Sequence, residues 1–339
     1  MIKFLFAMTV ACVATIAMAQ SGVHQTGFVQ IRPDRVLNVD YYPAAPGQPT
    51  LVLLNGLTYD LTNFDPMMPH LLGNGYGILR YDPFGMGQTL VHYGAVTQPI
   101  PIESQVEDLH ELLTVLNLNQ VYLSGLSYGG GLALKFAATW PANVKEMILM
   151  SSFVSPRDNV PNPQDEIVQA EIKAARLANP LNPMTDDQLY DFYFRQLVYE
   201  TYPTAEPEVL ENPYKLEATF RLADGIRKFI TDDFIQYWPQ HSIHMMDGDQ
   251  DQYIPAQMPL DFWNGLQPGQ RLSKININNS THKMPEVIPT FASAWINLIM
   301  SGNPALQEGN VFAGDALTGI VSGPALNMCL PADNSIIPN

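Results

Sequence analysis

The sequence predicts an α/β fold in which a mostly parallel central sheet is covered by helices on both faces. Continuous apolar runs at residues 50–54 and 144–150 are typical of strands buried on both faces. Between them, residues 102–116 place apolar side chains three and four positions apart, as one buried face of a helix requires. Strands that alternate with helices in this way favour parallel pairing.

The same patterns assign the rest of the chain. Further strands are expected at residues 27–31, 36–41, 77–81, 121–124, 243–246 and 274–277, and further helices at 130–140, 186–201 and 287–300. Residues 154–235 lack clear strands and contain the aromatic-rich helix, so they predict a helical cap inserted over the core. The core then spans residues 20–153 and 236–300, and residues 301–339, rich in Gly, Pro and Asn, predict an irregular C-terminal extension.

Composition indicates a globular protein that does not bind nucleic acid. The 339 residues are 46% hydrophobic and 15% charged, which is typical of a folded domain. Acidic residues outnumber basic ones by 33 to 17, giving a formal net charge of -16. Such a surface repels phosphate backbones, so the expected partner is a small-molecule substrate.

The first nineteen residues have the form of a secretory signal. Lys3 precedes an apolar run over residues 4–18, and residues 17–19 (Ala-Met-Ala) fit a cleavage site after Ala19. The run is short for a membrane span, although a retained anchor, or lipidation at Cys12, remains an alternative. We therefore expect a secreted or periplasmic protein in which Cys329 is the only cysteine, so that no internal disulfide can form.

Residues 125–129 (Gly-Leu-Ser-Tyr-Gly) match the pattern G-x-S-x-G. The pattern alone is weak, since average residue usage produces it by chance in about one in ten chains of this size. Here a short apolar strand precedes it and an alanine-rich helix follows, which is the strand–turn–helix setting of a nucleophile elbow. Side chains beside the serine would clash in so tight a turn, which explains the glycines. Ser127 is the predicted nucleophile.

A serine hydroxyl needs a base, and after an elbow serine the chain order is acid and then histidine. Three histidines follow Ser127. His241 and His244 are three apart at the start of a strand, so they point to opposite faces and would not share a metal, and His244 is expected to be packed or hydrogen-bonded. His282 follows the last expected strand and precedes the last helix, where a loop can bring its imidazole to the elbow, so it is the predicted base.

The acid is expected in the aspartate-rich segment that starts at Asp247. A calcium loop is excluded because its sixth position would be Gln252 rather than glycine and its twelfth Met258 rather than glutamate. A turn whose carboxylate orients the histidine fits better, and Asp251 is the predicted acid. Asp249 and, further away, Asp158 remain alternatives.

The oxyanion of an acyl-transfer reaction needs backbone N–H donors. One is expected from Tyr128, directly after the nucleophile, and the other from Leu57 in the loop that follows residues 50–54. A plain turn is the alternative interpretation of Asn55-Gly56.

Together these segments, over about residues 27–300, resemble the α/β-hydrolase superfamily in its branch with a helical cap. Residues 82–87 (Asp-Pro-Phe-Gly-Met-Gly) are similar to its D-x-x-G-x-G turn, residues 248–255 to its acid loop, and His282 with Pro285 and Glu286 to its histidine loop. Two positions depart from the family pattern, which usually has histidine at Asn55 and often at Leu126, and these leave the subfamily open.

The resemblance implies a serine hydrolase that requires neither a metal nor an organic cofactor. Serine at position 127 argues against the epoxide hydrolase and haloalkane dehalogenase branches, which use aspartate, and the Asn55 loop lacks the proline-containing glycine run of prolyl aminopeptidases. We expect ester hydrolysis through an acyl-enzyme. Lactone, amide, peptide or carbon–carbon cleavage, and a non-catalytic binding protein, remain alternatives. The aromatic cap predicts an apolar group on the substrate, unless those aromatics are only the cap's own core.

Overall fold

The computed structural model describes residues 23–156, 163–227 and 229–333. The expected signal peptide, Cys12 and the alternative acid Asp158 lie outside these ranges.

A single sheet of eleven strands runs through the described chain, in the order β1-β2-β4-β3-β5-β6-β7-β8-β9-β10-β11. The strands from β4 through β9 pair in parallel, and those at the two ends pair antiparallel. This confirms the mostly parallel sheet. The strands are β1 (Gln25–Arg32), β2 (Arg35–Tyr42), β3 (Thr50–Leu54), β4 (Gly77–Asp82), β5 (Val121–Leu126), β6 (Val144–Met150), β7 (Ile243–Gln250), β8 (Arg271–Thr281), β9 (Asn310–Asp315), β10 (Ile320–Ser322) and β11 (Asn327–Cys329).

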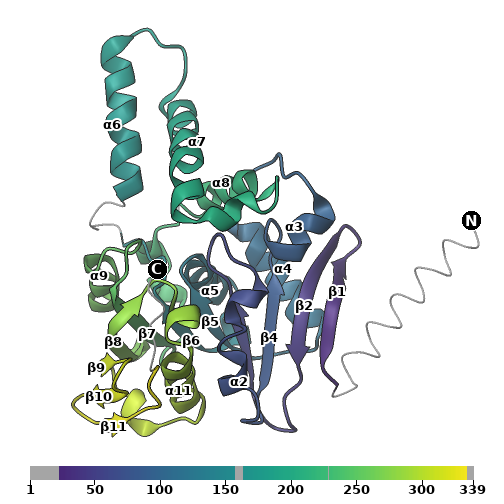
Figure 1. Cartoon of the computed structure of the whole chain (residues 1–339), viewed down its shortest axis with the longest axis vertical. Helices are drawn as coiled ribbons and strands as arrows, with labels where there is room; N and C mark the ends of the chain where they lie inside the picture. Colours follow the sequence, from purple (N-terminus) through teal and green to yellow (C-terminus); the bar gives the residue numbers. More distant parts are fainter. Residues whose placement is uncertain (1–22, 157–162, 228, 334–339) are drawn as a thin grey trace, which may run out of the picture.

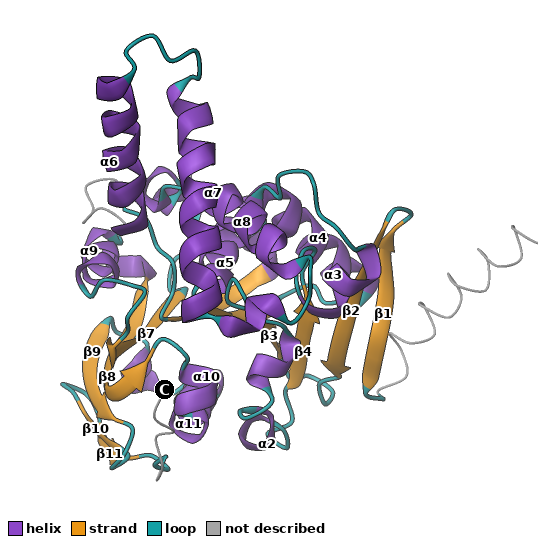
Figure 2. Cartoon of the chain, turned by 45° about the horizontal axis from the view of Figure 1, so that its top comes forward, coloured by secondary structure: helices purple, strands orange, loops and turns teal. Residues whose placement is uncertain are grey.

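Helices cover both faces of this sheet, as Figures 1 and 2 show. The side chains of β3 alternate between two separate apolar clusters, with Val52 and Leu54 in one and Leu51 and Leu53 in the other. The first cluster is closed by α3 (Gly87–Tyr93), α4 (Ile102–Val115), α5 (Tyr128–Thr139) and α9 (Gln257–Gly265). The second is closed by α2 (Met68–Leu71), α10 (Met284–Val287) and α11 (Pro289–Met300).

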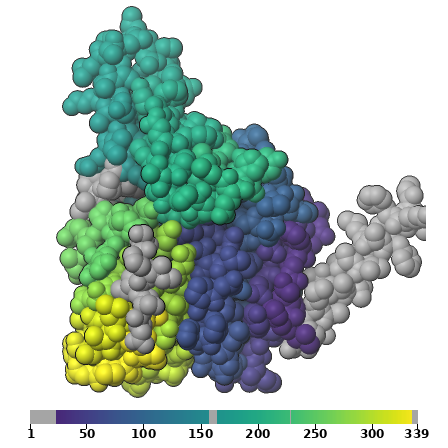
Figure 3. All heavy atoms as spheres, in the orientation of Figure 1, coloured from purple at the N-terminus to yellow at the C-terminus, as the bar shows by residue number. Residues whose placement is uncertain are grey.

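In the described part of the chain between β6 and β7 there are three α-helices: α6 (Pro163–Ala178), α7 (Asp186–Ala205) and α8 (Lys215–Ile226). In Figures 1 and 3, α6 and α7 form a hairpin that projects from the sheet domain, and α8 lies between the hairpin and the domain. Thr185 starts α7 with a capping box, in which its hydroxyl accepts from the Gln188 N–H at 3.2 Å. The insertion has its own apolar cluster, drawn from all three helices.

The C-terminal segment corrects an expectation, because residues 301–339 are not irregular throughout. β9 pairs in parallel with β8, and β10 and β11 extend the sheet. Phe312 is 1% exposed and its ring lies 5.3 Å from that of Trp295 in α11. Gly314, one of the glycines that made this segment look irregular, leaves room for Phe291 and Ile275, against which a Cβ would clash.

Two helical details also differ from expectation. Pro289 interrupts the helix expected over residues 287–300, so α10 ends at Val287 and α11 begins at Pro289. In the core, the short helices α2 and α3 and the helix α9 were not predicted. In the described part of the chain, no helix combines the length and the apolar character needed to cross a membrane.

Candidate active site

Ser127 lies in the turn between β5 and α5, with φ 52° and ψ -116°, a conformation that non-glycine residues seldom adopt. Hydrogen bonds hold it there: its N–H donates to the Met150 carbonyl at 3.0 Å, and its carbonyl accepts from Gly130 and Phe153 N–H groups, each at 2.9 Å. The first residue of α5 follows at once, so Ser127 stands at the positive end of a helix dipole. The local geometry is that of a nucleophile elbow.

The glycines on either side of Ser127 are required by close backbone contacts. A Cβ on Gly125 would clash with the backbone of Gly129 and Gly130, and one on Gly129 would clash with the carbonyls of Leu54 and Asn55. The second contact also brings the start of the expected oxyanion loop against the elbow.

His282 and Asp251 are in direct contact. The Nδ1 atom of His282 lies 3.0 Å from Oδ1 and 2.9 Å from Oδ2 of Asp251. Both side chains are buried, with 5% and 7% of their surface exposed. They come from the carboxyl ends of the neighbouring parallel strands β7 and β8, which meet at one edge of the sheet. An imidazole that donates its Nδ1–H to a carboxylate keeps a lone pair on Nε2, as a general base requires.

Asp251 remains ionised despite its burial. Desolvation alone would raise its pKa, but the hydrogen bond and charge of His282 and the N–H groups of Ile254 and Tyr253 hold the pKa below its ordinary value. Both N–H groups donate to Oδ1, each at 2.9 Å. Within the described chain, Oδ2 makes its one hydrogen bond with the imidazole, which also lies 3.0 Å from Oδ1.

The alternative acid, Asp249, lies elsewhere. It is exposed, and its Oδ1 accepts from the Ser280 N–H at 3.2 Å. Asp247 pairs with Lys274. His244 is fully buried between Ser273, at 2.7 Å from Nδ1, and Glu146, at 3.1 Å from Nε2, and burial lowers its pKa. His244 is thus the hydrogen-bonded strand residue that the sequence predicts.

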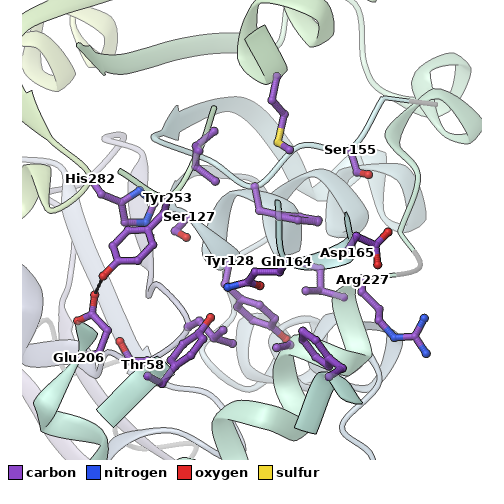
Figure 4. A pocket seen from close by; sticks show the side chains of 18 of the residues that line it. Thr58, Ser127, Tyr128, Ser155, Gln164, Asp165, Glu206, Arg227, Tyr253 and His282 are labelled. Atoms are coloured by element: carbon purple, nitrogen blue, oxygen red, sulfur yellow. Dashed lines mark hydrogen bonds between the residues drawn. The ribbon is translucent and has the colours of Figure 1, made fainter. Parts of the chain in front are cut away.

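Ser127 and His282 line the same cavity, and Figure 4 shows them near each other at one end of it. Among the described residues, no hydrogen bond joins the hydroxyl of Ser127 to the imidazole. In enzymes without a bound substrate, such contacts are often long and tighten on binding.

The two expected oxyanion donors, Leu57 and Tyr128, border this cavity as well. Within the described ranges, neither N–H donates to another backbone carbonyl, so both remain available to a ligand. The loop that carries Leu57 is fixed by Asn55, which is 2% exposed and whose Nδ2 donates to the Tyr81 carbonyl at 3.1 Å.

Asp82, the first residue of the D-x-x-G-x-G turn, fixes the chain that follows this loop. Its carboxylate accepts from the N–H groups of Leu61 and Gln88 and from Nδ2 of Asn38, each at 2.8 Å. Burial raises the pKa of Asp82 to about 6, although these three donors oppose the shift.

The cavity has a volume of about 530 Å³ and lies between the sheet edge and the helical insertion. Its wall is largely apolar and aromatic, and it includes Tyr190 and Phe194 of α7. The same two side chains belong to the insertion's own apolar cluster. These aromatic side chains therefore form part of the insertion's own core and also a wall of the cavity, so the two alternatives raised for them by the sequence hold together.

Sequence reasoning missed a polar cluster at the serine end of the cavity. Glu206, at the end of α7, accepts from the Tyr253 hydroxyl, as Figure 4 shows, and from Nζ of Lys283 at 2.9 Å. Tyr253 and Lys283 stand within two residues of Asp251 and His282, which is the signal that could have identified them. Nothing in the sequence pairs them with Glu206, 47 and 77 residues away.

The described residues hold no group of three or more His, Cys, Asp or Glu side chains arranged to bind a metal ion. The site that they form is instead a serine at a helix N-terminus, a histidine–aspartate pair and backbone donors around one cavity.

Together, fold and site define a hydrolase with a serine at the nucleophile elbow of a parallel sheet. The chain belongs to the alpha/beta hydrolase fold family, whose model matches residues 49–282.

Named relatives share the class. A 2-hydroxy-6-oxononadienedioate/2-hydroxy-6-oxononatrienedioate hydrolase of Pseudomonas putida is 26% identical over 262 residues, which cover 72% of this chain and 86% of that protein. A proline iminopeptidase of Thermoplasma volcanium is 27% identical over 179 residues, 50% of this chain, and the match spans only 59% of the iminopeptidase. Among solved structures, a membrane phospholipase A aligns with a TM-score of 0.60 at 16% identity, covering 89% of this chain and 99% of that one, and this likeness shows the fold alone.

Proposed function

We propose that this protein hydrolyses carboxylic esters through an acyl-enzyme on Ser127, with His282 and Asp251 completing a catalytic triad. The observation that carries the proposal is the His282–Asp251 pair, at 2.9 Å, whose histidine lines the same cavity as the elbow serine.

In this mechanism, Nε2 of His282 takes the hydroxyl proton as Oγ of Ser127 attacks the acyl carbon. Asp251 holds the imidazole tautomer and stabilises the cation that forms. The N–H groups of Leu57 and Tyr128, with the α5 dipole, stabilise the oxyanion. The alcohol leaves with the proton from His282. Water, deprotonated by the same imidazole, then releases the acid from Ser127.

The cavity supports a small substrate with an apolar acyl or alcohol group. A volume of about 530 Å³ accommodates a molecule of drug-like size, and the aromatic side chains of α7 provide an apolar surface for it. The net charge of -16 favours neutral substrates over anionic ones.

A fluorophosphonate probe tests the nucleophile, because only an activated serine reacts with it. The wild type should be labelled and Ser127→Ala should not. A wild type that stays unlabelled, or a Ser127→Ala variant that is labelled equally, would refute the catalytic role of Ser127. An unlabelled wild type would favour a binding protein on this fold. Assays of acyl esters of several chain lengths, beside amides and lactones, then show which type of bond the protein cleaves.

A second candidate reaction is cleavage of another acyl bond, and the relationship to the Pseudomonas putida hydrolase favours a carbon–carbon bond next to a ketone. The same triad can serve both reactions. If the protein reacts with the fluorophosphonate probe and hydrolyses no ester but cleaves a 6-oxo dienoate, the result would favour carbon–carbon cleavage.

We also propose that the protein is exported and cleaved after Ala19. This proposal rests on the pattern of residues 1–19. Expression of the full chain in a bacterium, followed by N-terminal sequencing of the periplasmic fraction, should give Gln20 as the first residue. An intact Met1 on cytoplasmic protein would contradict it.

A further inference from the structure

A buried carboxylate from the helical insertion holds both loops of the proposed triad. Glu206 is 4% exposed and follows the last residue of α7. Its Oε1 accepts from the Tyr253 hydroxyl, and its Oε2 accepts from Nζ of Lys283 at 2.9 Å. Burying a carboxylate is costly unless it is paired and hydrogen-bonded, and here both oxygens have a donor.

The two donors belong to the two loops that carry Asp251 and His282. The backbone N–H of Tyr253 donates to Asp251 at 2.9 Å, and the Tyr253 ring packs edge-on against the imidazole of His282, with 4.9 Å between the ring centroids and a 72° angle between the planes. Lys283 directly follows His282 in the chain. Glu206 is thus linked to Asp251 through Tyr253, and to His282 through both Tyr253 and Lys283.

We propose that Glu206 is a positioning residue that holds His282 and Asp251 in catalytic register, through Tyr253 and Lys283, when the insertion is seated on the sheet domain. The proposal rests on the proposed hydrolase function. It concerns residues that lie outside the triad and assigns to the insertion a role beyond forming the cavity wall.

The geometry explains why this carboxylate matters more than its neighbour. Glu208 lies 3.6 Å from Nζ of Lys283 and is half-buried, so it can bind the lysine in part. In the described chain, the Tyr253 hydroxyl donates to Glu206 and not to Glu208. Without Glu206, the Tyr253 hydroxyl loses its acceptor, and the ring that packs on His282 is no longer held. Misplacement of a catalytic group by about 1 Å costs on the order of a hundredfold in rate.

Glu206 also lines the cavity, so a direct contact with substrate is the competing role. The two roles differ kinetically. Loss of a substrate contact that is equal in the ground and transition states raises KM and leaves kcat unchanged, whereas loss of positioning lowers kcat.

The test compares Glu206→Ala, Glu206→Gln and Tyr253→Phe with Glu211→Gln as a control for a nearby exposed charge. We expect Glu206→Ala and Tyr253→Phe each to lower kcat and the rate of fluorophosphonate labelling by about 10- to 100-fold, with KM changed less than about threefold. Glu206→Gln keeps an acceptor for the tyrosine but turns its NH₂ group toward Nζ of Lys283, so it should recover part of the loss. Glu211→Gln should match the wild type. Thermal unfolding of each variant establishes that it is folded, and Tyr253→Phe is the milder change should Glu206→Ala not fold.

The double variant Glu206→Ala/Tyr253→Phe gives the sharpest result. Because both changes break the same link, its kcat should fall no further than that of the worse single variant. Additive losses, a raised KM at unchanged kcat, or labelling of Glu206→Ala at the wild-type rate would overturn the positioning role. A wild type that the probe does not label would instead refute the proposed function.

Discussion

Replacement of Asp251 by asparagine should inactivate the protein by reversing one hydrogen bond. Oδ1 of Asp251 accepts two backbone N–H groups, from Tyr253 and Ile254, each at 2.9 Å, and also lies 3.0 Å from Nδ1 of His282. Among the described residues, Oδ2 has Nδ1 of His282 as its one hydrogen-bond partner, at 2.9 Å. An asparagine at this position keeps its oxygen on the two backbone donors. Its amide NH₂ then takes the place of Oδ2 and points a donor at Nδ1.

An amide NH₂ in the place of Oδ2 opposes the Nδ1–H of the imidazole, and we expect the imidazole to change its tautomer in response. Nδ1 becomes the acceptor and the proton moves to Nε2, which can then no longer accept the proton of Ser127. Asparagine in place of a triad aspartate lowers kcat by about 10⁴-fold in a serine protease where the effect has this cause, or about 5 kcal/mol of transition-state stabilisation. We expect a loss of at least 10³-fold here, because the two backbone donors hold the asparagine oxygen and leave its NH₂ group facing Nδ1 of His282.

The assay is kcat/KM on a chromogenic acyl ester, together with the rate of fluorophosphonate labelling. Since the backbone donors keep their acceptor, the thermal unfolding curve of Asp251→Asn should stay close to that of the wild type. Asp249→Asn is the matched control and should retain activity within about threefold, because among the described residues its carboxylate accepts a hydrogen bond from the Ser280 N–H alone. Activity of Asp251→Asn within tenfold of the wild type, or an equal loss in Asp249→Asn, would refute this reasoning.

Three further predictions concern the frame around the site. Gly129→Ala should lower kcat/KM and the labelling rate by more than about a hundredfold, because its Cβ clashes with the Leu54 carbonyl and shifts the elbow; near-wild-type labelling would contradict this. Burial raises the pKa of Asp82 from 3.8 to about 6, so between these pH values the folded protein keeps a proton that the unfolded chain loses. The free energy of unfolding should therefore fall by about 3 kcal/mol as the pH rises from below 3.8 to above 6. Urea unfolding between pH 4 and 7 should show this decrease in the wild type, and Asp82→Asn should show a flatter profile; equal slopes would contradict it. Phe312→Ala should cost about 3–5 kcal/mol of stability, measured by urea unfolding, because its ring is buried against Trp295, and a loss under 1 kcal/mol would mean that β9 is peripheral.

The sequence predicts the elbow well because the elbow is local. Ser127, its two flanking glycines, the apolar strand before it and the helix after it lie within about twenty residues. The constraint on Gly125 comes from the backbone of this same segment, and only that on Gly129 comes from a distant strand end, at Leu54. The order of serine, acid and histidine then selects His282 without any knowledge of contacts. These features follow from short-range sterics and from the common edge at which parallel strands end.

The choice between Asp249 and Asp251 depends on strand register, which the sequence does not specify. β7 continues through Gln250, which pairs with Thr281 of β8. Asp249 therefore remains on an exposed strand, and Asp251 is the first residue beyond it, beside the residue that follows Thr281. If β7 ended two residues earlier, Asp249 would be the first residue beyond the strand and would take the place that Asp251 has in the structure.

The C-terminal strands and Glu206 were missed for a related reason. Gly314 suggests irregular chain by composition, but in the structure it gives space to Phe291 and Ile275, which come from other parts of the chain. Glu206 is one of many acidic residues until the insertion is placed over the sheet. Both are tertiary contacts, and no local pattern encodes them.

The insertion and the site depend on each other physically. Phe194 packs against Phe220 of α8, with 5.8 Å between the ring centroids, and also lines the cavity. A smaller side chain there would enlarge the cavity and weaken the insertion's core at once. Because Glu206 ends the same helix, such a change would also reach the loops that hold Asp251 and His282. Variants of α7 made to alter substrate preference should therefore be screened for kcat as well as KM, since α7 provides both the cavity wall and the proposed support of the triad.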